Sequence, residues 1–129
     1  MIPIDQTIFS TPEDKVKGNC LQAALASIFE LPLEKVPHFA EMGHDWYQQM
    51  WDWLKRFGLM PLCVQKSSGR LVFGYSIGTG PGPRGFQHAV VCHDGEIVHD
   101  PHPSKAGLVE LKEWIQFVLV DPSKLKDHA

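Results

Sequence analysis

The sequence predicts an α+β fold in a single domain. Two stretches with the apolar spacing of amphipathic helices come first, and five short stretches rich in Val, Ile and aromatic residues follow. Helices before strands is the order expected of helices packed on a mostly antiparallel sheet, without the alternation that builds a parallel sheet. A chain of 129 residues fits one domain, and we treat residues 1–129 as one.

The first predicted helix follows a polar arm. Residues 1–18 carry two prolines and end at Gly18, and we expect an ordered arm or loop there. Asn19 is a favourable N-cap residue, so Cys20 would lie in the first turn of the helix. The helical spacing is formed by Leu21, Ala24, Leu25, Ile28 and Phe29.

Two more helical segments are predicted before residue 58. Pro32 and Pro37 bracket a short helical turn, and a second long helix runs from residue 44 to a stop at Gly58. Trp51 lies off the apolar stripe of this helix and is a candidate to line a cleft. The stripe itself, which indicates a core-facing side, consists of Trp46, Met50, Trp53, Leu54 and Phe57.

Five strands are predicted in the second half, at residues 59–65, 70–77, 87–93, 96–100 and 114–120. The glycine- and proline-rich residues 78–86 are expected to form a tight turn, in which Arg84 is a candidate to bind a carboxylate or phosphate. Cys63 and Cys92 are expected to be buried on strands. Surface positions are expected for His38, His44 and His128.

Composition argues against several classes of protein. The net charge of -3 and a pI near 6.1 give no basic footprint, so we expect neither nucleic acid nor an anionic membrane surface as the main partner. No stretch approaches the roughly 20 apolar residues of a membrane helix, and residues 1–19 do not resemble a secretory signal, so we do not expect export. Three cysteines without a CxxC pair favour a reducing, cytoplasmic setting over a disulfide framework. Oligomeric state has no signature here.

Cys20 is the first candidate for chemistry. The helix N-terminus carries partial positive charge and unpaired N–H groups, which favour a thiolate. A free cysteine is more often a small buried hydrophobe. The surrounding sequence KGNCLQAALASIF places a glycine and a capping residue before the cysteine and an apolar helix after it, an arrangement that presents a nucleophile.

The base is expected on the stretch HAVVCHDGEIVHDPHP, residues 88–103. A two-residue turn at residues 94–95 would place Asp100 on the face opposite His88. A three-residue loop with a bulge at Gly95 would instead pair Val90 with Val98 and His88 with Asp100. We expect the bulged loop, because it brings a base and an orienting carboxylate side by side.

A zinc site is the alternative use of these histidines. It would be built from His93, His99 and His102, or from His88 with two of them. Strand alternation separates His88 from His93 and His99, and no spacing matches a familiar zinc motif. We therefore expect no metal and regard the cluster as partly an exposed polar face.

A helix-capping cysteine, a histidine that opens an apolar strand and an aspartate followed by proline together resemble the papain-like cysteine peptidases. The nearest likeness is to the compact branch that includes the bacteriocin-leader peptidases, over residues 18–30 and 86–103. The resemblance implies a papain-like fold, with helices on a mostly antiparallel sheet. It also implies that Cys20 is the nucleophile, His88 the general base and acid, and Asp100 the residue that orients the imidazole.

The implied function is hydrolysis of a peptide or amide bond through an acyl-enzyme, without a cofactor. The same Cys–His pair would also serve an acyltransferase, and an inactive or zinc-binding module of the same fold stays an alternative. In the resembling enzymes a glutamine shortly before the cysteine helps to hold the oxyanion, but Asp14 stands there in this chain. Gln6 becomes the candidate donor if the arm folds over the helix tip, and Asn19 is a second candidate.

Overall fold

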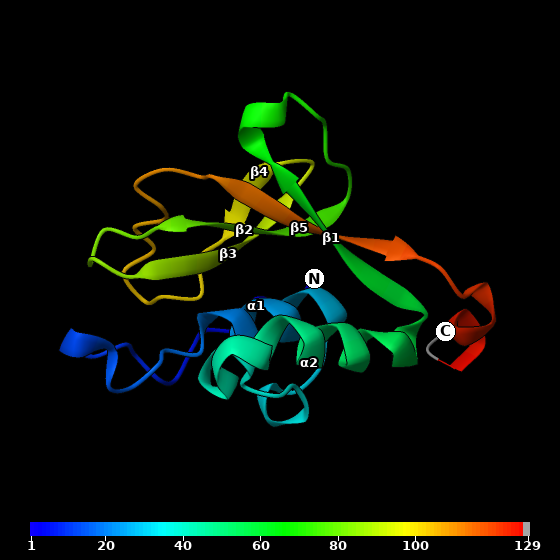
Figure 1. The fold of residues 1–129 in the computed structure, drawn as a ribbon, viewed down its shortest axis with the longest axis horizontal. Coiled ribbons are helices and arrows are strands. Elements are labelled where there is room, and N and C mark those ends of the chain that lie inside the picture. The colour runs from blue at the N-terminus through cyan, green and yellow to red at the C-terminus, as the bar shows by residue number, and fades with distance from the viewer. Residues whose placement is uncertain (128–129) are drawn as a thin grey trace.

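Two helices lie beneath a five-stranded antiparallel sheet in the computed structural model, which describes residues 1–127 (Figure 1). This layout confirms the predicted α+β class. The prediction for His128 lies outside the described residues. The helices are α1 (Cys20–Phe29) and α2 (Trp46–Leu54), and the strands are β1 (Leu59–Gln65), β2 (Tyr75–Pro81), β3 (Gln87–His93), β4 (Glu96–His99) and β5 (Glu113–Leu119).

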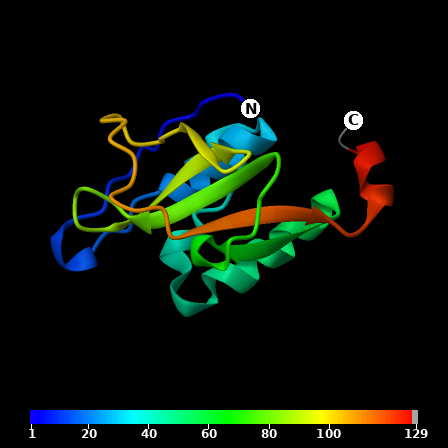
Figure 2. The same ribbon diagram turned by 90° about the horizontal axis from the view of Figure 1, so that it is seen from above.

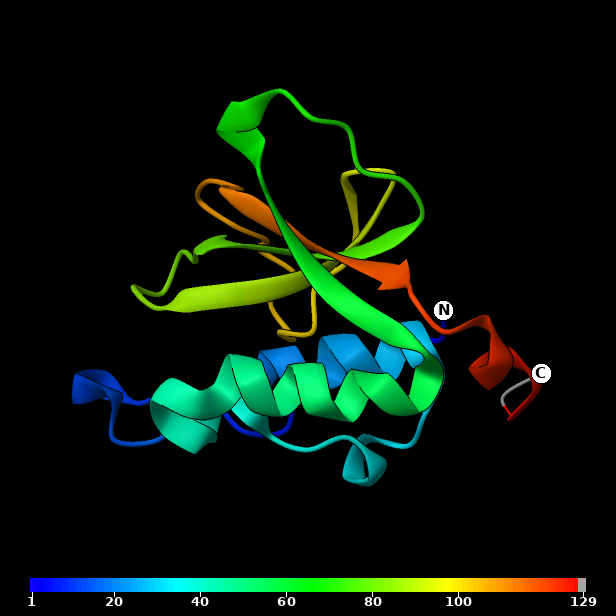
Figure 3. The same cartoon turned by 45° about the vertical axis from the view of Figure 1, so that its right-hand side comes forward.

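The last strand in the chain lies inside the sheet. The strand order is β1-β5-β2-β3-β4, and every neighbouring pair is antiparallel. The two layers, with both helices on one side of the sheet, are seen from another side in Figure 3. Within residues 1–127 no helix combines the length and the apolar character that a bilayer crossing requires.

The main core fills the space between the two layers. Helix α1 begins at Cys20 as predicted, and Ala23 to Ala26 of its middle turn are fully buried. Against them pack buried residues of α2 and of the sheet, including Met50, Leu54, Ile77, Val91 and Ile115. Because α1 is enclosed along this face, the position of Cys20 at its tip is fixed by core packing.

The second helical region ends where predicted but begins later. A short 3₁₀ helix at residues 33–35 occupies the predicted turn, and another, over residues 39–45, precedes α2. A final 3₁₀ turn ends at Gly58, whose φ of 72° suits glycine. Cys63, expected to be buried, is exposed, because it lies on the edge strand β1, where the Tyr47 hydroxyl is 3.4 Å from its sulfur. Cys92 is buried as predicted.

A smaller apolar cluster covers the outer face of the sheet. It contains Val64, Val72, Val90, Cys92 and Trp114, with Leu108 and Leu111 packed on it. The segment that carries these leucines passes close to β2. A Cβ on Gly80 would lie 1.9 Å from the carbonyl oxygen of Glu110, so only glycine fits there.

Strand β2 differs from the prediction at both of its ends. Residues 78–81, expected to belong to a loop, form the second half of the strand, and the loop is confined to residues 82–86. Glycine in this strand reflects a neighbouring backbone and not a turn. At the other end, the predicted strand 70–77 begins only at Tyr75.

The β3–β4 hairpin differs from the bulged loop that we predicted. His93 pairs with Glu96, so Asp94 and Gly95 form a two-residue turn, and both have positive φ. The bulge lies within the strand: Cys92 pairs with Ile97 but Val91 pairs with His99, which leaves Val98 without a partner. The predicted pairing of Val90 with Val98 is therefore wrong.

The displaced bulge nevertheless keeps Asp100 on the required face. Since Val91 and His99 form a pair, the next positions along the two strands, Val90 and Asp100, lie on the opposite face. His88 shares a face with Val90 because the two are two residues apart. One unpaired residue between His93 and Asp100 shifts the alternation of side chains by one position. Asp100 then faces the same side of the sheet as His88, whether the unpaired residue lies in the turn or within β4.

The N-terminal arm is ordered, as predicted, and connects α1 to the hairpin. The side-chain oxygen of Asn19 accepts the backbone N–H groups of Thr7 and Ile8 at 2.9 and 2.8 Å. The N–H of Gln6 donates to the carbonyl of Pro101 at 3.0 Å. Figure 2 shows the arm, the β2–β3 loop and the segment after β4 converging at one end of the molecule.

Candidate active site

Cys20 lies at the tip of α1, at this end of the molecule. Its side chain is half-buried and lines two adjoining cavities. Burial raises the pKa of the Cys20 thiol, and the backbone N–H groups of Ala89, Leu21 and Cys20 itself oppose this shift without outweighing it. The N–H groups at the helix terminus therefore act in the predicted direction, but burial outweighs them, and the thiol needs a base as predicted.

A buried histidine–aspartate pair lies beside it. His88 opens β3, Asp100 follows β4, and His88 Nε2 is 2.6 Å from Asp100 Oδ1. Both side chains are about 5 % exposed. With the carboxylate ionised, Nε2 carries a proton that it donates to Asp100, so Nδ1 is the nitrogen available to a thiol.

Asp100 is held by more than His88. The N–H of His102 also donates to Oδ1, at 2.9 Å, and the N–H of Gly107 donates to Oδ2 at 2.8 Å. Burial raises the pKa of Asp100, but the hydrogen bonds from His88, His102 and Gly107 outweigh burial and hold the pKa below its ordinary value. The carboxylate is therefore a fixed acceptor for the imidazole.

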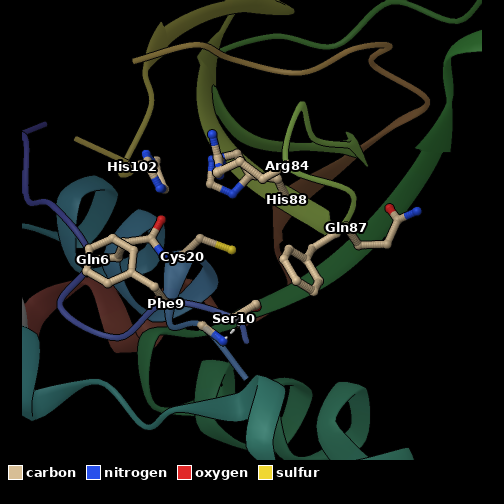
Figure 4. Close-up of a pocket in the computed structure, with 10 residues that line it drawn as sticks. Gln6, Phe9, Ser10, Cys20, Arg84, Gln87, His88 and His102 are labelled. Atoms are coloured by element: carbon tan, nitrogen blue, oxygen red, sulfur yellow. Dashed lines mark hydrogen bonds between the residues drawn. The ribbon is translucent and has the colours of Figure 1, made fainter. Parts of the chain in front are cut away.

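Cys20 and His88 line one small pocket of about 50 Å³. Figure 4 shows the Cys20 sulfur pointing into this pocket, on the side toward the His88 ring. We call this cavity the small pocket; its lining residues are Gln6, Phe9, Ser10, Gly18, Cys20, Arg84, Phe86, Gln87, His88 and His102.

A second, larger cavity adjoins the small pocket and shares six of its lining residues, among them Cys20 and His88. It is a groove of about 750 Å³ that runs between the helical layer and the sheet, and we call it the large groove. Its walls are mainly apolar, with Leu21 from α1, Trp46 from α2 and Ile115 from β5, and three charged residues, Glu13, Lys17 and Glu113, also line it. Cys20 therefore lies where two cavities of very different size meet.

The two candidate oxyanion donors have different surroundings. Gln6 is buried in the small pocket, where one amide hydrogen is donated to the carbonyl of Ile8 at 2.9 Å and the second has no recorded partner. Asn19 does not cap α1 through its side chain, and its two amide hydrogens are donated to Thr7 Oγ1 and Gln22 Oε1. Asn19 is therefore a structural residue of the arm and not a free donor.

The candidate substrate-binding residues also separate. Arg84 lines the small pocket and donates to Ser104 Oγ at 3.2 Å. Trp51 lines neither cavity; its ring packs on Tyr47, with centroids 6.2 Å apart. The tryptophan at the large groove is Trp46, because the groove faces the start of α2 and Trp51 lies more than one turn further on.

His102 is a site residue that sequence reasoning considered only as a zinc ligand. Its ring lies between Phe9 and His88, with centroid distances of 5.3 and 6.3 Å, and it lines the small pocket. Burial, followed by the nearby charge of Arg84, lowers the pKa of His102. The sequence held one indication of this role: His102 follows Asp100 by two residues, so a chain that turns around the Asp100 carboxylate keeps His102 near the site.

No three histidines of the zinc alternative meet within residues 1–127, although the His88 and His102 ring centroids are 6.3 Å apart. His99 Nε2 is bonded to the carbonyl of Ile4 at 2.8 Å under the arm, whereas His93 is exposed and packs on Tyr75. Among residues 1–127 no group of three His, Cys, Asp or Glu side chains is placed to hold a metal ion. These histidines take part in different local contacts.

Comparison of the chain with protein-family models, with curated proteins and with solved structures gave no match in any of the three. The assignment of a function therefore depends on the geometry of the site.

Proposed function

We propose that this chain is a papain-like, thiol-dependent hydrolase that cleaves a peptide or amide bond through an acyl-enzyme on Cys20. The observation that carries the proposal is the buried His88–Asp100 pair, with its 2.6 Å hydrogen bond, in the wall of the pocket that Cys20 also lines. A nucleophile, a base and a group that orients the base are the three parts that acyl transfer requires.

The first half of the reaction forms the acyl-enzyme. The Cys20 thiol gives its proton to His88 Nδ1 as the sulfur attacks the substrate carbonyl, and a C–S bond forms. Asp100 stabilises the resulting imidazolium and keeps its ring in place. The C–N bond then breaks, and His88 returns the proton to the leaving nitrogen.

The second half releases the product. A water molecule gives a proton to His88 and attacks the thioester carbonyl, a C–O bond forms, and the C–S bond breaks to regenerate the thiol. In both halves the carbonyl oxygen becomes an anion, which needs hydrogen-bond donors. The backbone N–H of Cys20 and the second amide hydrogen of Gln6 are the donors that we assign to it.

The cytoplasm is the compartment that suits this chemistry. The three cysteines of the chain are all free, and a reducing setting keeps a nucleophilic thiol active. The proposed reaction uses no cofactor.

Selective alkylation tests the proposal without a known substrate. Because burial raises the pKa of the Cys20 thiol, fast reaction with iodoacetamide at neutral pH requires a base to take its proton. We expect Cys20 to react faster than the exposed Cys63, as measured by mass mapping over time, and His88→Ala to remove this advantage.

Cys63 in the same molecule is the internal control, because His88→Ala should leave its rate unchanged. A Cys20 that reacts more slowly than Cys63 in the wild-type protein would contradict the proposal. For any peptide or amide found to be cleaved, Cys20→Ala should abolish turnover and leave the midpoint of thermal unfolding nearly unchanged.

A further inference from the structure

The charged side chains divide unequally between the two cavities that meet at Cys20. Arg84 and His102 line the small pocket, and its described lining contains no carboxylate. Two carboxylates, Glu13 and Glu113, line the large groove, against the single cation Lys17. A substrate bound across Cys20 therefore meets a basic environment on one side and a more acidic one on the other.

A peptide substrate has a chemical direction that this asymmetry can read. On the acyl side of the scissile bond a peptide chain ends in an ammonium group, and on the leaving side it ends in a carboxylate. Arg84 attracts a carboxylate and repels an ammonium group. The small pocket therefore suits the leaving side of the substrate, and the large groove suits the acyl side.

The size of the small pocket limits what it can hold. Its volume is about 50 Å³, against about 750 Å³ for the large groove, so it is much the narrower of the two cavities at Cys20. The small pocket therefore suits the shorter part of a substrate. A carboxylate at the end of that part would lie toward Arg84, which is exposed at the rim.

The polar atoms inside the pocket match the two ends of an amino acid. Gln6 is 7 % exposed, and its Oε1 is buried without a hydrogen-bond partner, so the pocket presents an acceptor that needs an N–H donor. His102 Nδ1 accepts the N–H of Ser104 at 3.0 Å, so the neutral ring carries its hydrogen on Nε2. That hydrogen and the Arg84 guanidinium are donors for a carboxylate.

We infer that the small pocket binds the leaving group of the proposed reaction, and that this leaving group is a single small amino acid with a free carboxylate. The inference rests on the proposed function. When the scissile C–N bond breaks, the nitrogen takes a proton from His88 and donates to Gln6 Oε1, while the carboxylate stays on Arg84 and His102. The acyl part stays on Cys20 Sγ as a thioester until water hydrolyses it.

Two alkylating agents of similar size test the charge preference directly. Iodoacetate carries the carboxylate that iodoacetamide lacks, and both react at Cys20 by forming an S–C bond and releasing iodide. We expect Arg84→Gln to lower the iodoacetate-to-iodoacetamide rate ratio at Cys20 by about fivefold, the size of an ion pair at a partly exposed site. Arg70→Gln is the matched control, because Arg70 is exposed and lines neither cavity.

The outcomes separate this inference from the proposed function. An unchanged ratio in Arg84→Gln, with Cys20 still reacting faster than Cys63, would overturn the inference and leave the hydrolase proposal standing. A Cys20 that reacts with neither reagent while Cys63 does would overturn both. A ratio that falls equally in Arg70→Gln would show a general effect of net charge and would also overturn the inference.

Peptides provide the second test. A pool of peptides with varied sequence and a C-terminal Gly or Ala is offered with free carboxylates and, separately, with amidated ends. We expect loss of one C-terminal residue from the free acids, at least about tenfold faster than from the amides, as hydrogen bonds to a charged group imply. Internal cleavage of both pools at equal rates would overturn the inference, and no Cys20-dependent cleavage of either pool would count against both proposals.

Discussion

Three donors converge on the carboxylate of Asp100, namely His88 Nε2 and the backbone N–H groups of His102 and Gly107. The two backbone donors lie on the segment that follows Asp100, so this segment folds around the side chain. Asp100 thereby links the orientation of the imidazole to the conformation of the chain after β4. Changes at this residue should affect both stability and reactivity.

We predict different costs for two substitutions of Asp100. Asp100→Ala leaves three donors, one of them the buried imidazole, without an acceptor, and should lower the free energy of unfolding by about 3–5 kcal/mol. Asp100→Asn keeps one oxygen for His88 and His102 but turns an N–H group toward Gly107, and should cost less. Urea unfolding measures the cost, and the Cys20-to-Cys63 alkylation ratio reports whether His88 stays oriented. Equal stability of wild type and Asp100→Ala would contradict this account.

The lowered pKa of Asp100 predicts a pH dependence of stability. A carboxyl whose pKa is lower in the folded than in the unfolded chain stabilises the fold at pH values above its ordinary pKa of 3.8. That contribution is lost as the pH falls through the lowered folded value. We therefore expect the stability difference between wild type and Asp100→Asn to shrink as the pH is taken from 6 to below 3.8, as urea titrations at each pH would show. A difference that is constant over this range would contradict the prediction.

At the scale of single residues, the sequence predicted five site positions that the fold brings together: Cys20, His88, Asp100, Gln6 and Arg84. Their residue types carried the signal. Asn19 and Trp51 have other surroundings than predicted, which depend on long-range packing: Asn19 holds an arm folded over the helix tip, and the turn of α2 that carries Trp51 does not face the groove.

At the scale of elements, the hairpin shows how register determines the site. An Asp-Gly pair favours a two-residue turn with positive φ at both positions, as observed at Asp94 and Gly95. The extra residue that Asp100 needs is then Val98, within β4. Its position could not be predicted, because EIVHD alternates equally well with or without a bulge and the contact of His99 with Ile4 comes from a distant part of the chain.

Insertion of one alanine after Val98 is predicted to separate the pair. With a one-residue bulge kept, the insertion moves Asp100 one position along β3, to the face opposite His88, and the Cys20-to-Cys63 alkylation ratio should fall to the level of His88→Ala. Deletion of Val98 is the matched control, because it removes the unpaired residue but leaves His99 opposite Val91 and Asp100 on the face of His88. An insertion variant that folds and retains the wild-type ratio would show that the register of this hairpin does not set the geometry.

At the scale of the whole molecule, the arm holds the helical layer and the hairpin together. Asn19 at the tip of α1 holds Thr7 and Ile8, while the neighbouring Gln6 bonds to Pro101 after β4. The sequence predicted an ordered arm but did not indicate which groups bind it, because Asn19 and Pro101 are not its neighbours in the chain. The wall of the small pocket formed by Gln6 exists only while the arm is bound.

Asn19→Ala is predicted to release the arm without unfolding the sheet. Removal of the shared acceptor leaves two backbone N–H groups unpaired and should cost about 1–3 kcal/mol. Amide hydrogen exchange of residues 6–8 should accelerate, while exchange in β3 stays slow. Thr7→Ala removes only one hydrogen bond to Asn19 and should have a much smaller effect. If amide exchange accelerated equally in the arm and in β3, the arm would unfold only together with the sheet, and the prediction would be wrong.

The place of β5 in the sheet has a consequence for the order in which the protein is made. Ribosomes synthesise β1 to β4 before β5, yet β5 lies between β1 and β2 and joins the two parts of the sheet. It also carries Glu113 and Ile115, which line the large groove. A growing chain can therefore contain Cys20, His88 and Asp100 and still lack one wall of the groove. The proposed enzyme should acquire a complete substrate site only after residue 119 has been added, even though its three proposed catalytic residues are in the chain by residue 100.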